Sequence, residues 1–463
     1  MSYTTTNFLY LLTIVSFILA LRFLSNPAHA RRGNQIGAVG MLLAIAITWV
    51  NVGGTSWWAL VVAMLIGGGG GAYAARKVKM TAMPQMVALF NGVGGGAAAL
   101  ISLAEIHRIL PEPGRPHWDI NTAIALSGLI GAISFAGSMI AFGKLQELIR
   151  GRPIQYPGQK VGNLLLLAAC AGLAAAVAAG VQTEWLLWAT VAGSALFGVL
   201  FVLPIGGADM PVVISLLNAF TGLAASAAGF LLHNNVLIVA GALVGASGTL
   251  LTLLMGRAMN RSIGNVLFGA FGSVASGGGP AAVEDGRSVR STTPEDLAIM
   301  LAYARRVVFV PGYGLAVAQA QHDVRALAEL LESKGIDVLY GIHPVAGRMP
   351  GHMNVLLAEA NVPYDQLKEM DEINPELPQT DVVVILGAND VVNPAAKDDP
   401  GSPIYGMPII EVDRAASVVV VKRSLSPGFA GIDNPLFYEP KTSMLFADAK
   451  QALEQVAAAV KGL

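Results

Sequence analysis

The C-terminal part of this chain contains Val307-Val308-Phe309-Val310-Pro311-Gly312-Tyr313-Gly314-Leu315-Ala316-Val317, the stretch that decides its fold. A β-branched run without alternation is typical of a strand buried on both faces of a parallel sheet. The glycines follow that strand and precede an expected helix, which is the setting of a dinucleotide-binding turn. Val317 stands in place of the motif's third glycine, so the prediction depends on the strand-turn-helix setting.

The same alternation of strand and helix continues to the end of the chain. Further strands are expected at 337–340, 382–386, 408–412 and 418–421. Helices are expected at about 315–334, 352–361 and 444–461. Buried strands alternating with helices indicate a doubly wound, Rossmann-like α/β domain over 306–463.

Residues 1–258 have a different character. The chain of 463 residues is 54% hydrophobic and 13% charged, whereas globular proteins are about 25% charged. A helix needs roughly 20 apolar residues to cross the bilayer. Nine runs meet this length: 5–24, 35–52, 56–75, 83–104, 121–142, 161–181, 184–204, 210–232 and 235–256. We therefore expect a transmembrane all-α bundle, joined to the α/β domain by a hinge at 259–305 that contains Ser276-Gly277-Gly278-Gly279-Pro280.

The loop charges predict an orientation, because Lys and Arg accumulate in cytoplasmic loops. They follow the odd-numbered spans: Arg22, Arg31, Arg32, Arg76, Lys77, Lys79, Lys144, Arg150, Arg152, Lys160, Arg257 and Arg261. The N-terminus is expected outside and the C-terminal domain in the cytoplasm. The net charge of −1 does not indicate nucleic-acid binding. Cys170 is the only cysteine, which excludes an intrachain disulfide and a cysteine-based metal cluster, and no metal is predicted.

Several strand ends carry residues suited to a dinucleotide. Lys422-Arg423-Ser424 offers two cations and a hydroxyl, which suit a 2′-phosphate, although a solvated strand end is the alternative. Gly341-Ile342-His343-Pro344 has no acidic residue for a ribose 2′-hydroxyl, which argues against NAD. The 345–351 loop brings Arg348 within reach of a pyrophosphate, and Gly387-Ala388-Asn389-Asp390 suits ribose or nicotinamide. These features favour NADP(H).

Polar side chains inside the apolar runs are candidates for an ion path, because their burial in hydrocarbon is costly. Asn91 and Asn218 lie within spans, and Asp209 lies at a cytoplasmic span end, where a helix N-cap is the alternative. Glycine-rich stretches such as 67–71 and 94–96 are interpreted mainly as close helix packing.

Together these motifs resemble the beta subunit of proton-translocating NAD(P) transhydrogenase, and the resemblance extends over nearly the whole chain. It rests on Pro311-Gly312-Tyr313-Gly314, the 341–355 segment, Gly387-Ala388-Asn389-Asp390 and Lys422-Arg423-Ser424. In the membrane part it includes Asp209-Met210-Pro211, Ser215-Leu216-Leu217-Asn218 and Met259-Asn260-Arg261-Ser262.

The resemblance implies an enzyme of the Si-specific/Re-specific, translocating class, in a bacterial inner membrane. Hydride would pass between NADH on an alpha subunit, which has further transmembrane helices, and NADP+ on this chain, while protons cross the membrane. The whole assembly would be a dimer. Asp390 would lie near the nicotinamide, as a catalytic residue that senses protonation. The implied cofactor residues are Gly312, Tyr313, Gly314, His343, Val345, Ala346, Gly347, Arg348, Met349, Pro350, Gly387, Ala388, Asn389, Asp390, Val391, Gly406, Met407, Lys422, Arg423, Ser424, Phe429, Ala430, Asp448 and Ala449.

One position departs from the resemblance. Many relatives carry a histidine where this chain has Asn91, which cannot titrate. We expect a partner-subunit helix to supply the titrating group there, with Asn218 and Asp209 lining the route. A channel or transporter gated by a dinucleotide-sensing domain is the alternative function, and an anchor with an empty domain is a third. A dinucleotide sensor would not need Lys422 and Arg423, and the intact loops at the strand ends argue against an empty domain.

Overall fold

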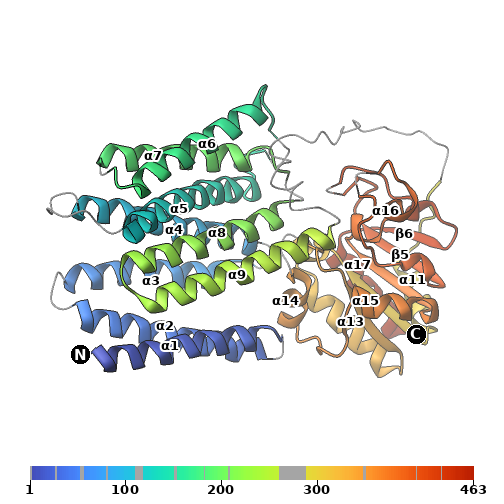
Figure 1. Ribbon diagram of the computed structural model, residues 1–463. Helices are drawn as coiled ribbons and strands as arrows, with labels where there is room; N and C mark the ends of the chain where they lie inside the picture. The colour runs from blue at the N-terminus through green and yellow to red at the C-terminus, as the bar shows by residue number, and fades with distance from the viewer. Residues whose placement is uncertain are drawn as a thin grey trace. The chain divides into compact units, whose positions relative to one another are not determined.

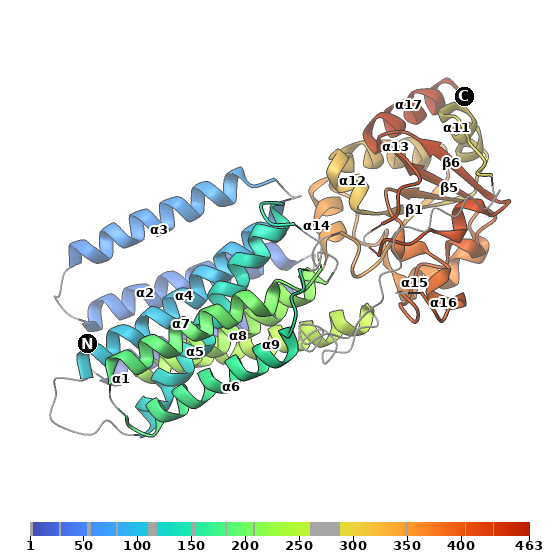
Figure 2. The same cartoon turned by 90° about the horizontal axis from the view of Figure 1, so that it is seen from above.

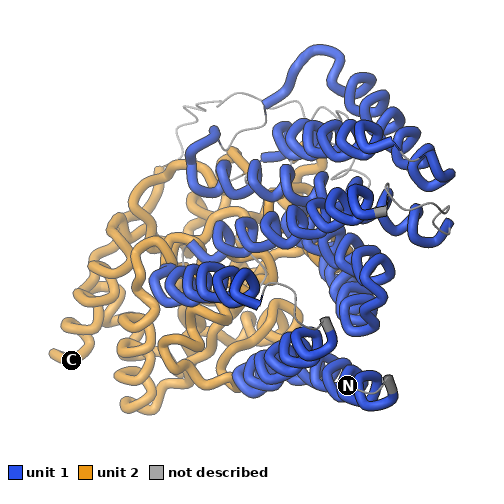
Figure 3. Tube along the Cα trace, turned by 90° about the vertical axis from the view of Figure 1, so that its left-hand side faces the viewer, with its two compact units in different colours: residues 1–206, 212–252, 268–272 blue, residues 207–211, 253–267, 273–463 orange. Residues whose placement is uncertain are grey.

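The computed structural model describes residues 3–26, 29–52, 57–79, 82–109, 118–150, 154–181, 183–206, 209–259, 288–347, 351–402, 404–428 and 430–463. Figures 1 and 2 show its helices and strands in two views. The chain divides into two compact units, which Figure 3 colours separately. The first comprises 1–206, 212–252 and 268–272, and the second comprises 207–211, 253–267 and 273–463.

Nine of the described helices are long and apolar enough to span a membrane, as the nine apolar runs predicted. They are α1 (Tyr3–Leu24), α2 (Ala30–Val52), α3 (Trp57–Lys77), α4 (Met83–Ile109), α5 (Trp118–Leu145), α6 (Gln159–Ala178), α7 (Glu184–Val202), α8 (Met210–Leu231) and α9 (Asn235–Ala258).

Glycines allow some of these helices to pack backbone against backbone. A Cβ atom added to Gly95 in α4 would lie 2.9 Å from the carbonyl oxygen of Gly131 in α5. One added to Gly222 in α8 would lie 2.5 Å from the amide nitrogen of Gly245 in α9. The packing interpretation therefore holds for these glycines. Residues 67–71 of α3 make no such contact within this chain, because added Cβ atoms there would meet nothing within 4 Å.

The second unit is built on a six-stranded parallel sheet with the order β3-β2-β1-β4-β5-β6. The strands are β1 (Arg306–Pro311), β2 (Asp337–Ile342), β3 (Leu367–Glu369), β4 (Val382–Leu386), β5 (Ser417–Lys422) and β6 (Thr442–Phe446). The chain winds outward from β1 to β3 and then returns to place β4 beside β1. The predicted Rossmann-like class is thus confirmed, with a topological switch point between β1 and β4.

Helices cover both faces of this sheet, and Figure 2 shows α11, α13 and α17 on one face and α15 and α16 on the other. Their bounds, with those of the shorter helices, are α11 (Pro294–Ala302), α12 (Tyr313–Ala318), α13 (Gln321–Ser333), α14 (His352–Glu359), α15 (Met370–Ile373), η3 (Asn374–Gln379), η4 (Asp390–Val392), α16 (Ala395–Asp398), η5 (Val412–Arg414), η6 (Pro435–Tyr438) and α17 (Ala449–Gly462). Val308, Val383 and Val418 are fully buried between these layers. Two-sided burial explains why the strands lack polar alternation.

The predicted strand at 408–412 was wrong. This segment is irregular as far as Glu411 and then enters η5. The side-chain amide of Asn374 donates to the carbonyl oxygen of Ile409 (3.1 Å) and accepts from the amide of Glu411 (3.0 Å). Pro408 has no N–H to give to a ladder. The apolar side chains at 409 and 410 are therefore core residues of a loop.

Two expected helices also differ from the structure. The helix predicted over 315–334 is two helices, α12 and α13, because Gln319 ends the first in the left-handed region at φ 53°. The helix predicted from 444 begins at Ala449, since β6 occupies the preceding residues as far as Phe446. Strands β3 and β6 were not predicted.

The expected hinge at 259–305 lies mostly outside the described residues. From residue 288 onward the chain is ordered against the sheet: the amide of Met444 in β6 donates to the carbonyl oxygen of Arg290 at 2.7 Å. Helix α11 then begins at Pro294, with the hydroxyl of Thr293 accepting from the amide of Asp296 (3.2 Å). The sheet unit thus includes residues 288–305.

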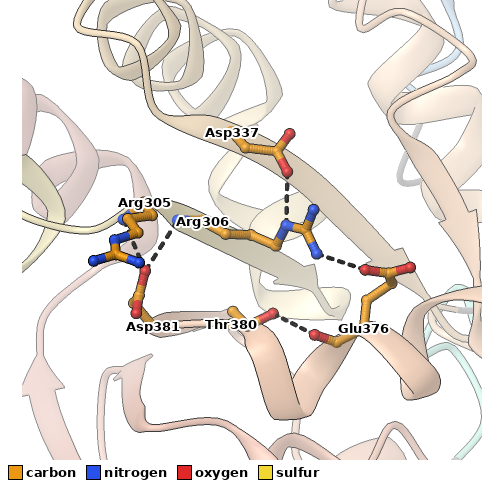
Figure 4. Close-up of polar contacts among 6 residues, drawn as sticks. All are labelled: Arg305, Arg306, Asp337, Glu376, Thr380 and Asp381. Atoms are coloured by element: carbon orange, nitrogen blue, oxygen red, sulfur yellow. Dashed lines mark hydrogen bonds and ion pairs between the residues drawn. The ribbon is translucent and has the colours of Figure 1, made fainter.

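A charged cluster ties the amino end of the sheet together (Figure 4). The guanidinium of Arg306 in β1 bonds Asp337 of β2 (2.6 Å) and Glu376 of η3 (2.5 Å). The carboxylate of Asp381 accepts from the amides of Arg305 (2.7 Å) and Arg306 (3.1 Å). The strand starts are therefore fixed to one another at the edge opposite the carboxyl ends.

Candidate functional site

The carboxyl ends of all six strands meet at one edge, and the turns after β1 and β4 touch there. A Cβ atom on Gly312 would lie 2.4 Å from the backbone of Ala388, and one on Gly314 would lie 2.6 Å from Gly387 Cα. The amide of Gly314 donates to the carbonyl oxygen of Gly387 (3.0 Å), and Gly387 itself has φ 68°. Only glycine allows this approach. The predicted turn and the Gly387-Ala388 segment are thus brought together at the switch point.

His343, at the end of β2, joins two loops of this edge. Its Nδ1 accepts from the amide of Val345 (3.2 Å), so Nε2 carries the proton and donates to the carbonyl oxygen of Pro408 (2.8 Å). Burial lowers the pKa of His343, which opposes protonation, and the bond to Pro408 only partly offsets this. The neutral imidazole therefore connects the 345–347 loop to the 406–409 segment.

The loop after His343 packs on a second histidine. Gly347 has φ 100°, and a Cβ atom there would lie 2.3 Å from Nδ1 of His352. The ring of Tyr313 lies near the same imidazole, with 6.4 Å between centroids. Val345 and Ala346 complete the described part of the loop, and the predicted residues Arg348, Met349 and Pro350 lie outside the described residues.

Asp390, at the end of β4, lies under the loop that follows β5. Its Oδ2 accepts from the amide of Ala430 at 3.0 Å. A Cβ atom on Gly428 would lie 2.5 Å from Oδ1 of the same carboxylate. The structure thus brings Asp390 and Ala430 together as neighbours, whereas the predicted Phe429 lies outside the described residues.

Lys422, at the end of β5, has a half-buried ammonium. Its Nζ donates to the carbonyl oxygen of Ser426 (2.5 Å) and lies 5.0 Å from the centre of the Phe437 ring. Burial lowers the pKa of Lys422, while the charges of Asp390 and Asp433 act against this.

Arg423 and Ser424 are exposed beside Lys422. The Ser424 hydroxyl lies 2.9 Å from that of Ser426. Two basic residues and a hydroxyl residue therefore follow one another at the carboxyl edge, and these residue types are suited to a phosphate group.

Asn389 is held between these loops. The side chain of Asn434, only 1% exposed, donates to the carbonyl oxygen of Asn389 at 3.1 Å. With the Asn389 amide turned to satisfy its neighbours, its oxygen accepts from Lys422 Nζ (3.2 Å) and from the amide of Gly428 (2.6 Å). The strand ends of β4 and β5 are thereby linked through polar groups.

The remaining predicted residues are at the same edge but bond elsewhere. The amide of Gly406 donates to the carbonyl oxygen of Ala396 (2.7 Å), and Met407 lines a pocket of about 510 Å³ beside α15 and α16. Asp448 caps α17 by accepting from the amide of Lys450 at 3.1 Å. Ala449 is the first residue of that helix, and Val391 lies in η4.

Within the membrane helices, Asn91 belongs to a buried polar cluster. Its Nδ2 donates to Ser138 Oγ of α5 at 2.9 Å and lies 3.4 Å from Ser134 Oγ. Ser134 Oγ in turn lies 2.5 Å from Thr221 Oγ1 of α8. Asn218 is half-buried one turn before Thr221 on the same helix. The helices carrying Asn91 and Asn218 therefore meet through hydroxyl groups.

Asp209 directly precedes α8, which begins at Met210. This position agrees with either role considered for it, a helix cap or a group at the end of an ion route.

Comparison with known proteins decides the family. The sequence model of the NAD(P) transhydrogenase beta subunit matches residues 6–459. The chain is 48% identical to the NAD(P) transhydrogenase subunit beta of Rhodospirillum rubrum, over 99% of this chain and 100% of that protein. The protein of the same name from a designated strain of that species matches equally.

The chain belongs to the NAD(P) transhydrogenase beta subunit family.

Membership agrees with both parts of the fold, since a transhydrogenase beta subunit handles nicotinamide dinucleotides and this one carries membrane helices and a Rossmann-like sheet. Together with the apolar helices among the described residues, it identifies the chain as an integral membrane protein.

The transhydrogenase sheet unit contains site residues that sequence reasoning missed. Asn434 reaches Asn389 from 45 positions away, and no sequence motif marks it. Gly428, beside Asp390, belongs to the 425–430 loop that the resemblance implied for the site. His352 lies in the 341–355 segment on which the resemblance rests, but it was not predicted as a site residue. In the membrane unit, Ser134 and Ser138 were missed because single serines in an apolar run are usually satisfied by their own helix.

Proposed function

We propose that this subunit binds NADP(H) in its Rossmann-like unit and passes hydride between it and NADH bound by the alpha subunit, while its membrane helices carry protons across the bilayer. The observation that supports this most is the meeting of the Gly312–Gly314 turn with Gly387 at the switch point, beside the Lys422-Arg423-Ser424 strand end. Dinucleotides bind at such a switch point in open α/β sheets.

The residues present fit a 2′-phosphorylated dinucleotide. The glycines let the turns after β1 and β4 touch, since a Cβ atom on Gly312 or Gly314 would collide with the backbone of the other turn. The backbone amides of such a turn would bind the pyrophosphate. Lys422, Arg423 and Ser424 would hold the 2′-phosphate, because cations and a hydroxyl are the groups that bind it. Strand β2 ends without a carboxylate that would favour an unphosphorylated ribose.

The nicotinamide supplies the hydride chemistry when bound, so the protein's work is orientation and electrostatics. His343 keeps two loops of the site in place as a neutral group. Asp390 would lie beside the nicotinamide, held by its bond to the amide of Ala430. Protonation of its carboxylate would change the charge beside the nicotinamide, and this is how the residue would sense protonation. The described residues form one sheet with one topological switch point, so NADH would be bound by the alpha subunit.

Protons would pass by Asn91, Asn218 and Asp209. The amides and hydroxyls of the Asn91 cluster do not titrate, so a helix of the alpha subunit would supply the titrating group there. The positive-inside rule supports an external N-terminus and a cytoplasmic sheet unit in a bacterial inner membrane. The complete enzyme would be a dimer of such assemblies.

The direct test uses the purified full-length chain in detergent. NADPH and NADH binding are compared by nucleotide fluorescence, and the expected result is strong preference for NADPH. Replacing Arg423 by Met should weaken NADPH binding and leave the weak NADH binding unchanged. Hydride transfer is then followed after adding the alpha subunit. Equal affinity for both nucleotides, or transfer without the alpha subunit, would overturn the proposal.

A further inference from the structure

Lys144, at the end of α5, is a charged group that the proposed mechanism does not use. The residue is only 3% exposed. Its ammonium donates to the carbonyl oxygens of Leu203 and Ile205, the latter at 2.8 Å. Both of its described partners are thus backbone carbonyls beyond the end of α7.

A buried ammonium is expensive in a membrane protein, and ionisable groups kept there commonly serve a function. Helix α7 ends at Val202, and the negative end of its dipole lies among the following carbonyls. Pro204 follows the cap residue, so the chain leaves the helical course there. A cation with three donors can hold such carbonyls in place, whereas an aliphatic side chain could fill the volume but could not hold them.

Lys144 lies where several membrane helices are tied together. The carbonyl oxygen of Leu203 also accepts from the amide of Ile154 at 3.1 Å. The side chain of Gln85 in α4 donates to the carbonyl oxygen of Leu145, the residue after Lys144 (3.1 Å). Buried hydrogen bonds thereby connect the start of α4, the end of α5 and the residues that follow α7.

The turn that Lys144 holds comes shortly before α8 in the chain. Ile205 lies four residues before Asp209, which directly precedes that helix. Displacement of the 203–206 turn would therefore change how the chain enters α8, the helix that carries Asn218.

We propose that Lys144 is a positioning residue for proton translocation, in which its ammonium fixes the 203–206 turn and so the start of the Asp209 to Asn218 route. The proposal rests on the proposed function, because it assigns Lys144 to the coupling of proton movement to hydride transfer. Lys144 acts through the turn and does not itself carry the proton.

The test compares Lys144→Met with Lys144→Arg in the complete enzyme, reconstituted with its alpha subunit in proteoliposomes. Hydride transfer and proton pumping are measured on the same vesicles. For Lys144→Met, the ratio of pumping to hydride transfer should fall at least about threefold, because both charge-assisted bonds are lost. Lys144→Arg should retain most of the ratio. The matched control is Lys160→Met, which removes an exposed lysine at the start of α6 and should leave the ratio unchanged.

A second measurement reports on the turn without using activity. Ile205 is 6% exposed, and Cys170 is the only native cysteine. With Ile205→Cys in a Cys170→Ser background, maleimide should label residue 205 slowly, and Lys144→Met should accelerate the labelling severalfold. If Lys144→Met does not assemble, Lys144→Gln, which keeps donors but no charge, takes its place.

The outcomes separate the two proposals. Parallel loss of both activities at a constant ratio, or unchanged labelling of residue 205, would make Lys144 a structural helix cap and overturn the inference. Hydride transfer without pumping in the unmodified enzyme would instead overturn the proposed function, while the labelling experiment would still decide whether Lys144 holds the turn.

Discussion

The imidazole of His343 joins two loops of the dinucleotide site through two hydrogen bonds. Replacing it by Gln or by Asn removes one of these bonds and keeps the other. Gln places an amide nitrogen near the position of Nε2, so His343→Gln keeps the donor to Pro408 and loses the acceptor for Val345. Asn places an amide oxygen near the position of Nδ1, so His343→Asn does the opposite. His343→Ala loses both bonds.

The expected magnitude follows from burial. His343 is 2% exposed, so each substitution leaves a buried backbone group unpaired, at a cost of about 1–3 kcal/mol. If the bound nucleotide requires the ordered loops, this cost reduces NADP(H) affinity by roughly 5- to 150-fold. His343→Ala should lower the NADP(H) affinity more than either amide variant, because it loses both bonds and these hold different loops.

Steady-state hydride transfer by the complete enzyme is the assay. A positioning role predicts that the KM for NADPH rises in His343→Gln and His343→Asn, while kcat at saturating NADPH stays within about twofold of the unmodified enzyme. A melting temperature measured without nucleotide shows whether the fold is retained. A large fall in kcat at unchanged KM would refute the reasoning, because it would place His343 in the transfer step itself.

Further predictions concern the pH response, the glycine turn, the charged cluster and the membrane route. Because burial lowers the folded-state pKa of His343 below its unfolded value of about 6.5, the neutral ring stabilises the sheet unit above that pH. This contribution is lost as the pH falls through the lower folded pKa, so the melting temperature should decline more steeply below about pH 6.5 than in His343→Gln. Gly314→Ala should abolish NADPH binding, measured by fluorescence, because its Cβ atom would lie 2.6 Å from Gly387 Cα; normal binding would contradict the backbone contact. Arg306→Met should lower stability by about 1 kcal/mol and leave NADPH affinity unchanged, because the residue lies at the amino edge; calorimetry and binding measure the two effects. Asn218→Leu should reduce proton pumping in proteoliposomes, and unchanged pumping would remove Asn218 from the route.

The sequence was sufficient to predict an element wherever the composition of that one segment shows how it is buried. The valine runs of β1, β4 and β5 are buried on both faces, so their composition alone identifies them as central strands. The membrane spans were recognisable for the same reason, because hydrocarbon imposes length and polarity on each helix separately.

The sequence was insufficient to predict local structure wherever hydrogen bonds between residues far apart in the chain determine it. The 408–412 segment has the composition of a strand, but the amide of Asn374 satisfies its backbone and removes the need for a ladder. Lys144 has the appearance of an ordinary cytoplasmic loop charge, and only the fold brings it to the carbonyls beyond α7. Asn434 reaches its partner across 45 positions, a distance that no local pattern spans.

The contact between Gly314 and Gly387 limits how cofactor preference can be redesigned. Where two backbones already touch, there is no side chain to exchange and no space for a larger one, so the contact itself cannot be redesigned by substitution. Selectivity must be rewritten at its margins, at Arg423 and Ser424 and at the end of β2, where side chains are present to be replaced. A library confined to the exposed Arg423 and Ser424 would change the groups offered to a phosphate without disturbing the buried side chains of the sheet.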